Sequence, residues 1–174
     1  MKTESIEIII DKYQFPIYKY CYQMVRNKET AEDLTQEIFI KYYQLCTRKY
    51  YNTNYLYSIA HSKCIDSLRK QRREILFIKN LLQDDNYEIS TEDKYLNNQY
   101  SYELESILKK LSNYERSVLL LKTVNGLSFN EISMILNKKE TTVRKQFQRV
   151  KYKLEKELNK KGVNKIEGKV SFYG

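Results

Sequence analysis

The chain has 174 residues, enough for one ordinary domain or two small ones. Its 31 Lys and Arg residues against 22 Asp and Glu residues give a formal net charge of +9, which favours a polyanionic partner. The apolar runs are far shorter than the roughly 18 to 20 residues needed to cross a bilayer, and the N-terminus lacks a basic region followed by an apolar core, so we expect no membrane insertion and a cytoplasmic location. Three cysteines and a single His, without a CxxC pair, a Walker loop or a nucleophile with an evident base, predict no metal site, no cofactor and no enzymatic activity.

The low content of helix-breaking residues predicts an all-α fold, since the chain has one Pro and four Gly and its apolar residues recur at helical spacing. Composition shifts from basic at residues 63–73 to polar and acidic at residues 83–95, which marks a linker. We therefore expect two small helical domains joined by a flexible acidic linker. The expected segments are a first domain at residues 1–78, the linker at 79–99, a second domain at 100–160 and a disordered tail at 161–174.

In the first domain, Thr30 is expected to cap a helix whose third residue is Asp33. Helical periodicity places Leu34, Ile38, Tyr42 and Leu45 on one side, and Asp33, Gln36, Glu37 and Ile40 on the other. An isoleucine surrounded by carboxylates and an amide suits the docking of a basic helix. The same pattern also fits a solvated helix face with one exposed isoleucine, and the residues alone favour that simpler interpretation.

A loop at residues 47–54 precedes the next helix and is suited to holding an unstacked base, because amides can bond to base edges and aromatic rings can stack on them. Its candidate residues are Tyr50, Tyr51, Asn52, Thr53 and Asn54. The following helix ends in four cations that could bind phosphates, namely Arg69, Lys70, Arg72 and Arg73. An ordinary loop followed by a helix end whose charges complement the helix dipole explains the same pattern.

In the second domain, Ser112 with Glu115 and Ser128 with Glu131 form capping boxes that begin two successive helices. The buried side of the second of these helices is formed by Phe129, Ile132, Ile135 and Leu136, and Ser133 is small where the next helix must cross. That next helix has one apolar face, made of Val143, Phe147, Val150, Leu154 and Leu158. Two short helices that meet in this way are typical of a helix-turn-helix.

The opposite face of the last helix is polar and basic, and it is the surface that a DNA major groove would contact. Its candidate base-reading residues are Thr141, Arg144, Lys145, Gln148 and Arg149. Lys138, Lys139 and Lys151 are expected to contact phosphates instead. A solvated basic face is the simpler alternative, and a stand-alone helix-turn-helix regulator whose first domain dimerises or senses a ligand is the alternative function.

Three segments, in this order, resemble the bacterial RNA polymerase sigma factors of the sigma-70 class, in particular the compact two-domain extracytoplasmic-function type. The segments are AEDLTQEIFIKYY, YLYSIAHSKCIDSLRKQRR and LSNYERSVLLLKTVNGLSFNEISMILNKKETTVRKQFQRVKYKL. The resemblance implies a subunit that directs core RNA polymerase to promoters and helps to open the minus-10 region, while the polymerase performs the chemistry. It also implies three partners: core polymerase through the coiled coil of its largest subunit, promoter DNA and an anti-sigma factor.

The resemblance further assigns roles to residues. The polymerase contact would be Asp33, Gln36, Glu37 and Ile40. The minus-10 element would be contacted by Tyr50, Tyr51, Asn52, Thr53, Asn54, His61, Lys63, Asp66, Arg69, Arg72 and Arg73. The minus-35 element would be read by Thr141, Arg144, Lys145, Gln148 and Arg149.

The turn before the last helix departs from the family pattern at three positions. Asn137 stands where Gly is common, Lys138 where an apolar residue is usual, and Lys139 where Ser often caps the helix. Asn tolerates the left-handed conformation that such a turn needs. A lysine cannot accept the capping hydrogen bond, so the sequence leaves open where this helix begins.

Overall fold

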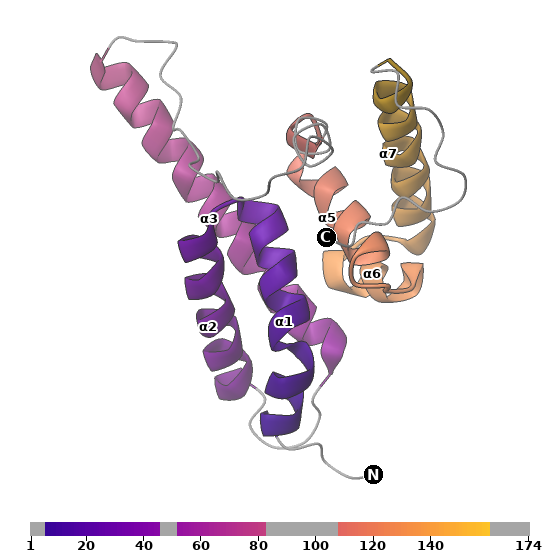
Figure 1. Ribbon diagram of the computed structural model, residues 1–174. Helices are drawn as coiled ribbons and strands as arrows, with labels where there is room; N and C mark the ends of the chain where they lie inside the picture. Colours follow the sequence, from indigo (N-terminus) through magenta and orange to yellow (C-terminus); the bar gives the residue numbers. More distant parts are fainter. Residues whose placement is uncertain (1–5, 46–51, 83–107, 161–174) are drawn as a thin grey trace. The chain divides into compact units, whose positions relative to one another are not determined.

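The computed structural model describes residues 6–45, 52–82 and 108–160. Its six helices are α1 (Ile6–Val25), α2 (Lys28–Leu45), α3 (Thr53–Leu82), α5 (Asn113–Thr123), α6 (Phe129–Leu136) and α7 (Glu140–Lys160), and no strand occurs within the described residues (Figure 1). The chain divides into two compact units, residues 1–95 and 96–174. This confirms the predicted all-α fold with two helical parts, and the predicted linker and tail lie mostly outside the described residues.

The first unit is a three-helix bundle in which α1, α2 and α3 pack against one another. Its most deeply buried large side chains come from all three helices and are Ile17, Tyr20, Met24, Ile38, Tyr42 and Leu56. Within α1 and within α2 these residues lie three, four or seven positions apart, which is the spacing that brings side chains to one helical face. The bundle core therefore follows from the periodicity of the sequence.

The turn between α1 and α2 corrects the expected start of α2. Arg26 takes a positive φ of 59° and ends α1, and the side-chain oxygen of Asn27 accepts a hydrogen bond from the backbone N–H of Thr30 at 2.8 Å. Asn27 is thus the capping residue, and the prediction that Thr30 caps this helix is wrong. Asn is as good a cap as Thr, and it comes first once α1 has ended.

The far end of α2 differs from the expectation in one residue. Leu34, Ile38 and Tyr42 are buried as predicted, but Leu45 is 50% exposed. Periodicity places Leu45 on the correct face, yet it is the last residue of the helix, where no neighbouring helix covers it fully.

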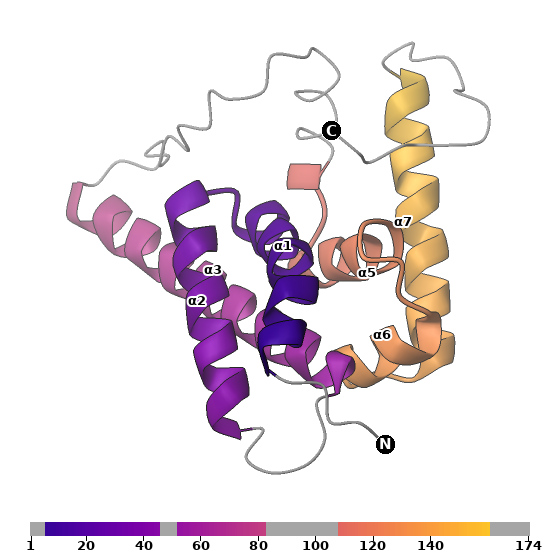
Figure 2. The same cartoon turned by 60° about the horizontal axis from the view of Figure 1, so that its bottom comes forward.

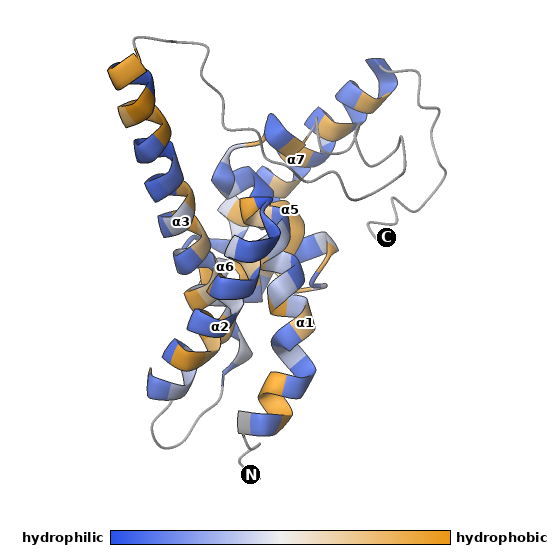
Figure 3. Ribbon diagram, turned by 60° about the vertical axis from the view of Figure 1, so that its left-hand side comes forward, coloured by the Kyte–Doolittle hydropathy of each residue, from blue (hydrophilic) through white to orange (hydrophobic). Residues whose placement is uncertain are grey.

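The longest helix, α3, has two different halves. Its buried residues lie between Leu56 and Cys64, whereas the last turns project past α1 and α2 (Figure 1) and expose apolar side chains such as Phe77, which is 65% exposed. Figure 3 colours these last turns largely hydrophobic. The helix also continues to Leu82, beyond the domain limit at residue 78 expected from composition.

In the second unit, α5, α6 and α7 share a core, and both predicted capping boxes are present. The backbone N–H of Glu115 bonds to the Ser112 hydroxyl at 3.2 Å, and that of Glu131 bonds to the Ser128 hydroxyl at 3.2 Å. Val143 and Val150 are fully buried, and Phe147 and Leu158 pack against the core at its edge, as their spacing predicted. Figure 2 shows α6 lying beside the first turns of α7, which is the arrangement of a helix-turn-helix.

The turn between α6 and α7 has the conformation expected for Asn. Asn137 is left-handed, with φ 50° and ψ 52°, and the backbone N–H of Lys138 bonds to the carbonyl of Ser133 at 3.0 Å. The main-chain carbonyl of Lys139 then accepts bonds from Thr142 at 2.9 Å and Val143 at 3.1 Å. The last helix therefore begins at Glu140, with Lys139 serving through its backbone rather than its side chain.

Within the described residues, no helix has both the length and the apolar character needed to span a membrane.

Candidate nucleic-acid interface

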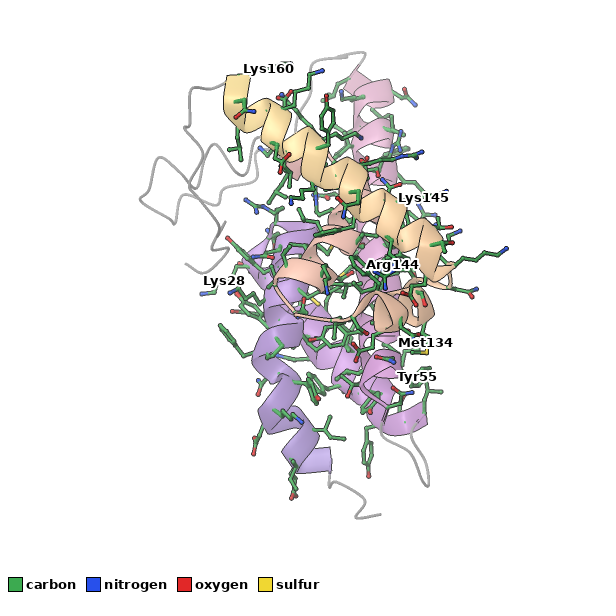
Figure 4. The ribbon with its side chains drawn as sticks, turned by 90° about the vertical axis from the view of Figure 1, so that its right-hand side faces the viewer. Lys28, Tyr55, Met134, Arg144, Lys145 and Lys160 are labelled. Carbon is green, nitrogen blue, oxygen red and sulfur yellow. The ribbon has the colours of Figure 1, made fainter. Side chains whose placement is uncertain are left out.

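The polar face of α7 carries the predicted base-reading residues. All five are exposed, and they lie in the first ten residues of the helix: Thr141, Arg144, Lys145, Gln148 and Arg149. Figure 4 labels Arg144 and Lys145 on adjacent positions of α7, with Arg144 on the side of α6. The buried Val143 and Val150 on the opposite face fix the rotation of α7 on its domain. The side chains of the polar face are consequently held outward on a rigid helix.

Arg144 is the most constrained member of this face. Its Nε and Nη2 atoms both donate to one oxygen of Glu140, at 2.8 and 2.6 Å. Its Cζ atom lies 4.7 Å from the ring centroid of Phe129, the first residue of α6. The ring contact could not be predicted from sequence spacing, whereas the spacing of four residues between Glu140 and Arg144 is the usual one for a helical ion pair.

A pocket beside Arg149 contains a buried carboxylate. Glu115 of α5 forms an ion pair with Lys153 and accepts a hydrogen bond from Gln146 at 3.3 Å. Burial acts to raise the pKa of Glu115, but hydrogen bonds from Lys153 and Ser112 outweigh it and hold the pKa below its ordinary value. Glu115 thus ties α5 to α7 beneath the basic surface.

The predicted minus-10 residues occupy several environments in the first unit. Tyr50 and Tyr51 lie outside the described residues. Asn52 is exposed, and its side-chain oxygen accepts the backbone N–H of Asn54 at 2.9 Å. The helix begins at Thr53 rather than after Asn54 as expected, because Asn52 supplies this hydrogen bond at the helix start.

Along α3, the predicted minus-10 residues fall into two groups, one exposed to solvent and one facing other helices. Asp66, Arg69, Arg72 and Arg73 are exposed, and Asp66 pairs with Arg69 at 3.6 Å. His61 is half-buried, with its Nδ1 atom 3.1 Å from the Tyr20 hydroxyl. Lys63 donates to Glu37 of α2 at 2.5 Å. The structure therefore gathers the arginines on the exposed surface and places His61 and Lys63 at helix contacts.

The predicted polymerase-docking residues share one exposed face of α2: Asp33, Gln36, Glu37 and Ile40. Ile40 is 57% exposed while the opposite side of the helix is buried. Tyr43, three residues after Ile40, extends the same face and is 62% exposed. Tyr43 is absent from the predicted docking residues, although helical spacing from Ile40 could have identified it.

Comparison with known proteins assigns both units. Residues 9–74 match the family model of Sigma-70 region 2, and residues 101–154 match that of Sigma-70, region 4. The ECF RNA polymerase sigma factor SigW of Bacillus subtilis is 30% identical over 167 residues, which cover 86% of this chain and 87% of SigW. The chain belongs to the ECF group of sigma-70 family sigma factors.

Other relatives are consistent with this assignment. The RNA polymerase sigma factor YlaC of Bacillus subtilis is 30% identical over 165 residues, covering 90% of this sigma factor and 94% of YlaC. The fold resembles that of RpoE bound to the anti-sigma factor NepR from Bartonella quintana, with a TM-score of 0.69, 18% identity, and coverage of 88% of this chain and 96% of RpoE. It also resembles CnrH bound to the cytosolic domain of CnrY, with a TM-score of 0.65, 17% identity, and coverage of 89% of this chain and 88% of CnrH.

Family membership confirms three predictions, the first of which came from the resemblance to the family and the other two from the residues. The sigma factor binds RNA polymerase and directs promoter recognition, it is not an enzyme, and its second unit is a DNA-binding helix-turn-helix. A stand-alone regulator is thereby excluded.

Proposed function

We propose that this sigma factor divides its work between the two units. In the first unit, α2 docks on core polymerase, while α3 and the segment before it contact the minus-10 element and help to open it. In the second unit, α7 reads the minus-35 element. The protein acts in the cytoplasm, where core polymerase works, and cell fractionation that found it mainly in membranes or outside the cell would contradict this location.

The docking proposal rests on one observation above all, the exposure of Ile40 among polar side chains on a helix whose opposite face is buried in the bundle except at its last residue, Leu45. Asp33, Gln36 and Glu37 surround it with two carboxylates and an amide. A basic helix with an apolar residue at its centre fits this surface, because burial of the isoleucine supplies affinity and the charged rim supplies orientation. We assign this surface to the coiled coil of the polymerase largest subunit.

Reversing the charge of the rim tests the docking proposal. The double variant Asp33→Lys, Glu37→Lys is expected to lose co-purification with core polymerase by at least roughly tenfold, since charges of like sign would face a basic partner. Ile40→Ala should weaken docking while leaving the ion pair between Glu37 and Lys63 intact.

A matched control reverses two exposed carboxylates on a different helix, Glu7→Lys with Asp11→Lys of α1, and should bind core polymerase normally. Circular dichroism must show that every variant remains folded. Normal binding and initiation by the Asp33, Glu37 double variant would refute the docking assignment.

For the minus-10 element, we propose that the segment Tyr50 to Asn54 holds a flipped non-template base. Along α3, the exposed Arg69, Arg72 and Arg73 suit phosphate contacts. We propose that Asp66 and the partly exposed His61 and Lys63 also contact this DNA. Extracting a base costs a few kcal/mol of stacking, which the contacts around it must offset.

For the minus-35 element, we propose that Thr141, Arg144, Lys145, Gln148 and Arg149 enter the major groove. This proposal is supported by the exposed face that these residues share at the N-terminal part of α7. In helix-turn-helix proteins, this part of the recognition helix contacts base edges.

We also propose that an anti-sigma factor holds this protein inactive. The proposal is supported by fold similarity to RpoE, which has been solved with the anti-sigma factor NepR, and to CnrH, which has been solved with the cytosolic domain of CnrY. The partner would compete with core polymerase.

A further inference from the structure

Arg144 is held from two directions before any DNA arrives. Glu140, one helical turn earlier, accepts both of its hydrogen bonds through a single oxygen, at 2.8 and 2.6 Å. Phe129 of α6 lies under the guanidinium, 4.7 Å from Cζ to the ring centroid. A planar guanidinium that is both hydrogen-bonded and stacked retains little rotational freedom.

The stacking ring is itself fixed by its neighbours. Phe129 packs edge-on against Phe147 of α7, with ring centroids 5.5 Å apart and an angle of 64° between the planes. The Nζ atom of Lys122 lies 4.8 Å from the Phe129 centroid and donates to the carbonyl of Leu127 at 3.0 Å. The ring is therefore a rigid support that α5, α6 and α7 build together.

The direction of these contacts determines which part of Arg144 can face a base. Glu140 bonds to Nε and Nη2, the inner edge of the guanidinium. The outer edge, formed by the two Nη atoms, has the geometry for paired hydrogen bonds to O6 and N7 of guanine, the commonest specific contact of arginine in the major groove. The carboxylate also cancels charge that would otherwise attract any nearby phosphate.

We propose that Glu140 and Phe129 are positioning residues that direct Arg144 toward a guanine of the minus-35 element. This inference rests on the proposed function, in which Arg144 is one of the reading residues. Glu140 would lower affinity for DNA in general and raise discrimination between sequences, because it restrains the cation and neutralises part of its charge. A residue needed only for folding would not move these two quantities in opposite directions.

The test uses the full-length sigma factor bound to core polymerase. Promoters are first mapped by transcription of a genomic template, and each guanine of one minus-35 element is then replaced by adenine. Holoenzyme binding is measured on the native duplex, each substituted duplex and a scrambled duplex. Glu140→Gln is expected to reduce discrimination at one guanine by roughly threefold or more, within the roughly 5- to 150-fold that such a contact supplies, and to bind scrambled DNA more tightly.

Two further variants separate positioning from charge. Glu155→Gln removes the same charge from the same helix, where Glu155 pairs with Lys151 at 3.9 Å, and should leave discrimination unchanged. Phe129→Leu keeps an apolar side chain against Phe147 but removes the ring face, so discrimination should fall at the same guanine without a change of charge. Thermal unfolding of each variant checks that the domain is intact.

Arg144→Ala distinguishes failure of this inference from failure of the proposed function. If Arg144→Ala loses discrimination while Glu140→Gln and Phe129→Leu retain it, Arg144 reads DNA without support and the inference is wrong. Sharper discrimination in Glu140→Gln would also overturn it, because Glu140 would then hold Arg144 away from DNA. If Arg144→Ala itself keeps full discrimination, the reading role of Arg144 fails.

Discussion

At the scale of single residues, His61 illustrates how the tertiary environment changes a side chain. It lies on α3 among the segments assigned to the minus-10 element, yet it is half-buried and its Nδ1 atom is 3.1 Å from the hydroxyl of Tyr20 on α1. Burial lowers the pKa of His61 below its ordinary value of 6.5, because the charged ring loses hydration in the bundle. Burial therefore favours the neutral form of the His61 ring in the folded first unit.

This pKa shift predicts a pH dependence of stability. Below pH 6.5 the unfolded chain binds a proton that the folded unit resists, so the stabilisation is complete above pH 6.5 and is lost as the pH falls below it. As the pH is lowered from 7.5 to 5, the thermal stability should fall more steeply for the natural protein than for His61→Gln, whose side chain cannot titrate in this range. Parallel curves for the two proteins would contradict this account.

At the scale of elements, the start of α3 combines a structural and a proposed functional role. The side-chain oxygen of Asn52 bonds to the backbone of Asn54 at 2.9 Å, while its amide nitrogen is the atom suited to donating to a base. In addition, Glu37 and Lys63 join α2 to α3 through a 2.5 Å ion pair. The proposed polymerase surface and the proposed minus-10 helix are thus in direct contact.

Two substitutions at Asn52 can separate its two roles. Asn52→Ala removes the cap, which should cost about 1 kcal/mol of stability, and should weaken binding of holoenzyme to a fork-junction DNA with an unpaired minus-10 base. Asn52→Asp keeps a capping oxygen but has no amide donor, so stability should be preserved while fork-junction binding falls more than closed-duplex binding. Undiminished fork-junction binding by Asn52→Asp would remove Asn52 from the proposed base pocket.

At the scale of the whole molecule, two units with separate cores lie on one chain, and each matches a different conserved region of the sigma-70 family. Under the proposed function, such a chain contacts polymerase and two promoter elements together. The net charge of +9 favours DNA in general, so specificity must come from individual contacts rather than from the charge.

The proposed anti-sigma partner predicts an effect of the order of addition. A protein that co-purifies with this sigma factor from its own bacterium should block transcription in vitro when added before core polymerase. It should have little effect after open complexes have formed, because the shared surface is then occupied. Failure to inhibit in either order would show that the captured protein is not the proposed competitor.

Several features of this protein follow from local sequence alone. The two capping boxes, the left-handed Asn137 and the apolar face from Val143 to Leu158 depend on residues within a few positions of one another, and helical periodicity and capping act over that range. For the same reason the exposed faces of α2 and α7 could be predicted residue by residue, whereas their polymerase and promoter roles came from resemblance to the family.

Other features were decided only by the tertiary structure. Lys63 pairs with Glu37 across 26 residues, and His61 contacts Tyr20 across 41 residues. The support of Arg144 by Phe129 likewise requires α6 to lie against α7. Periodicity identifies which face of a helix is polar, but it does not identify which neighbouring helix faces it, because that depends on how the helices pack.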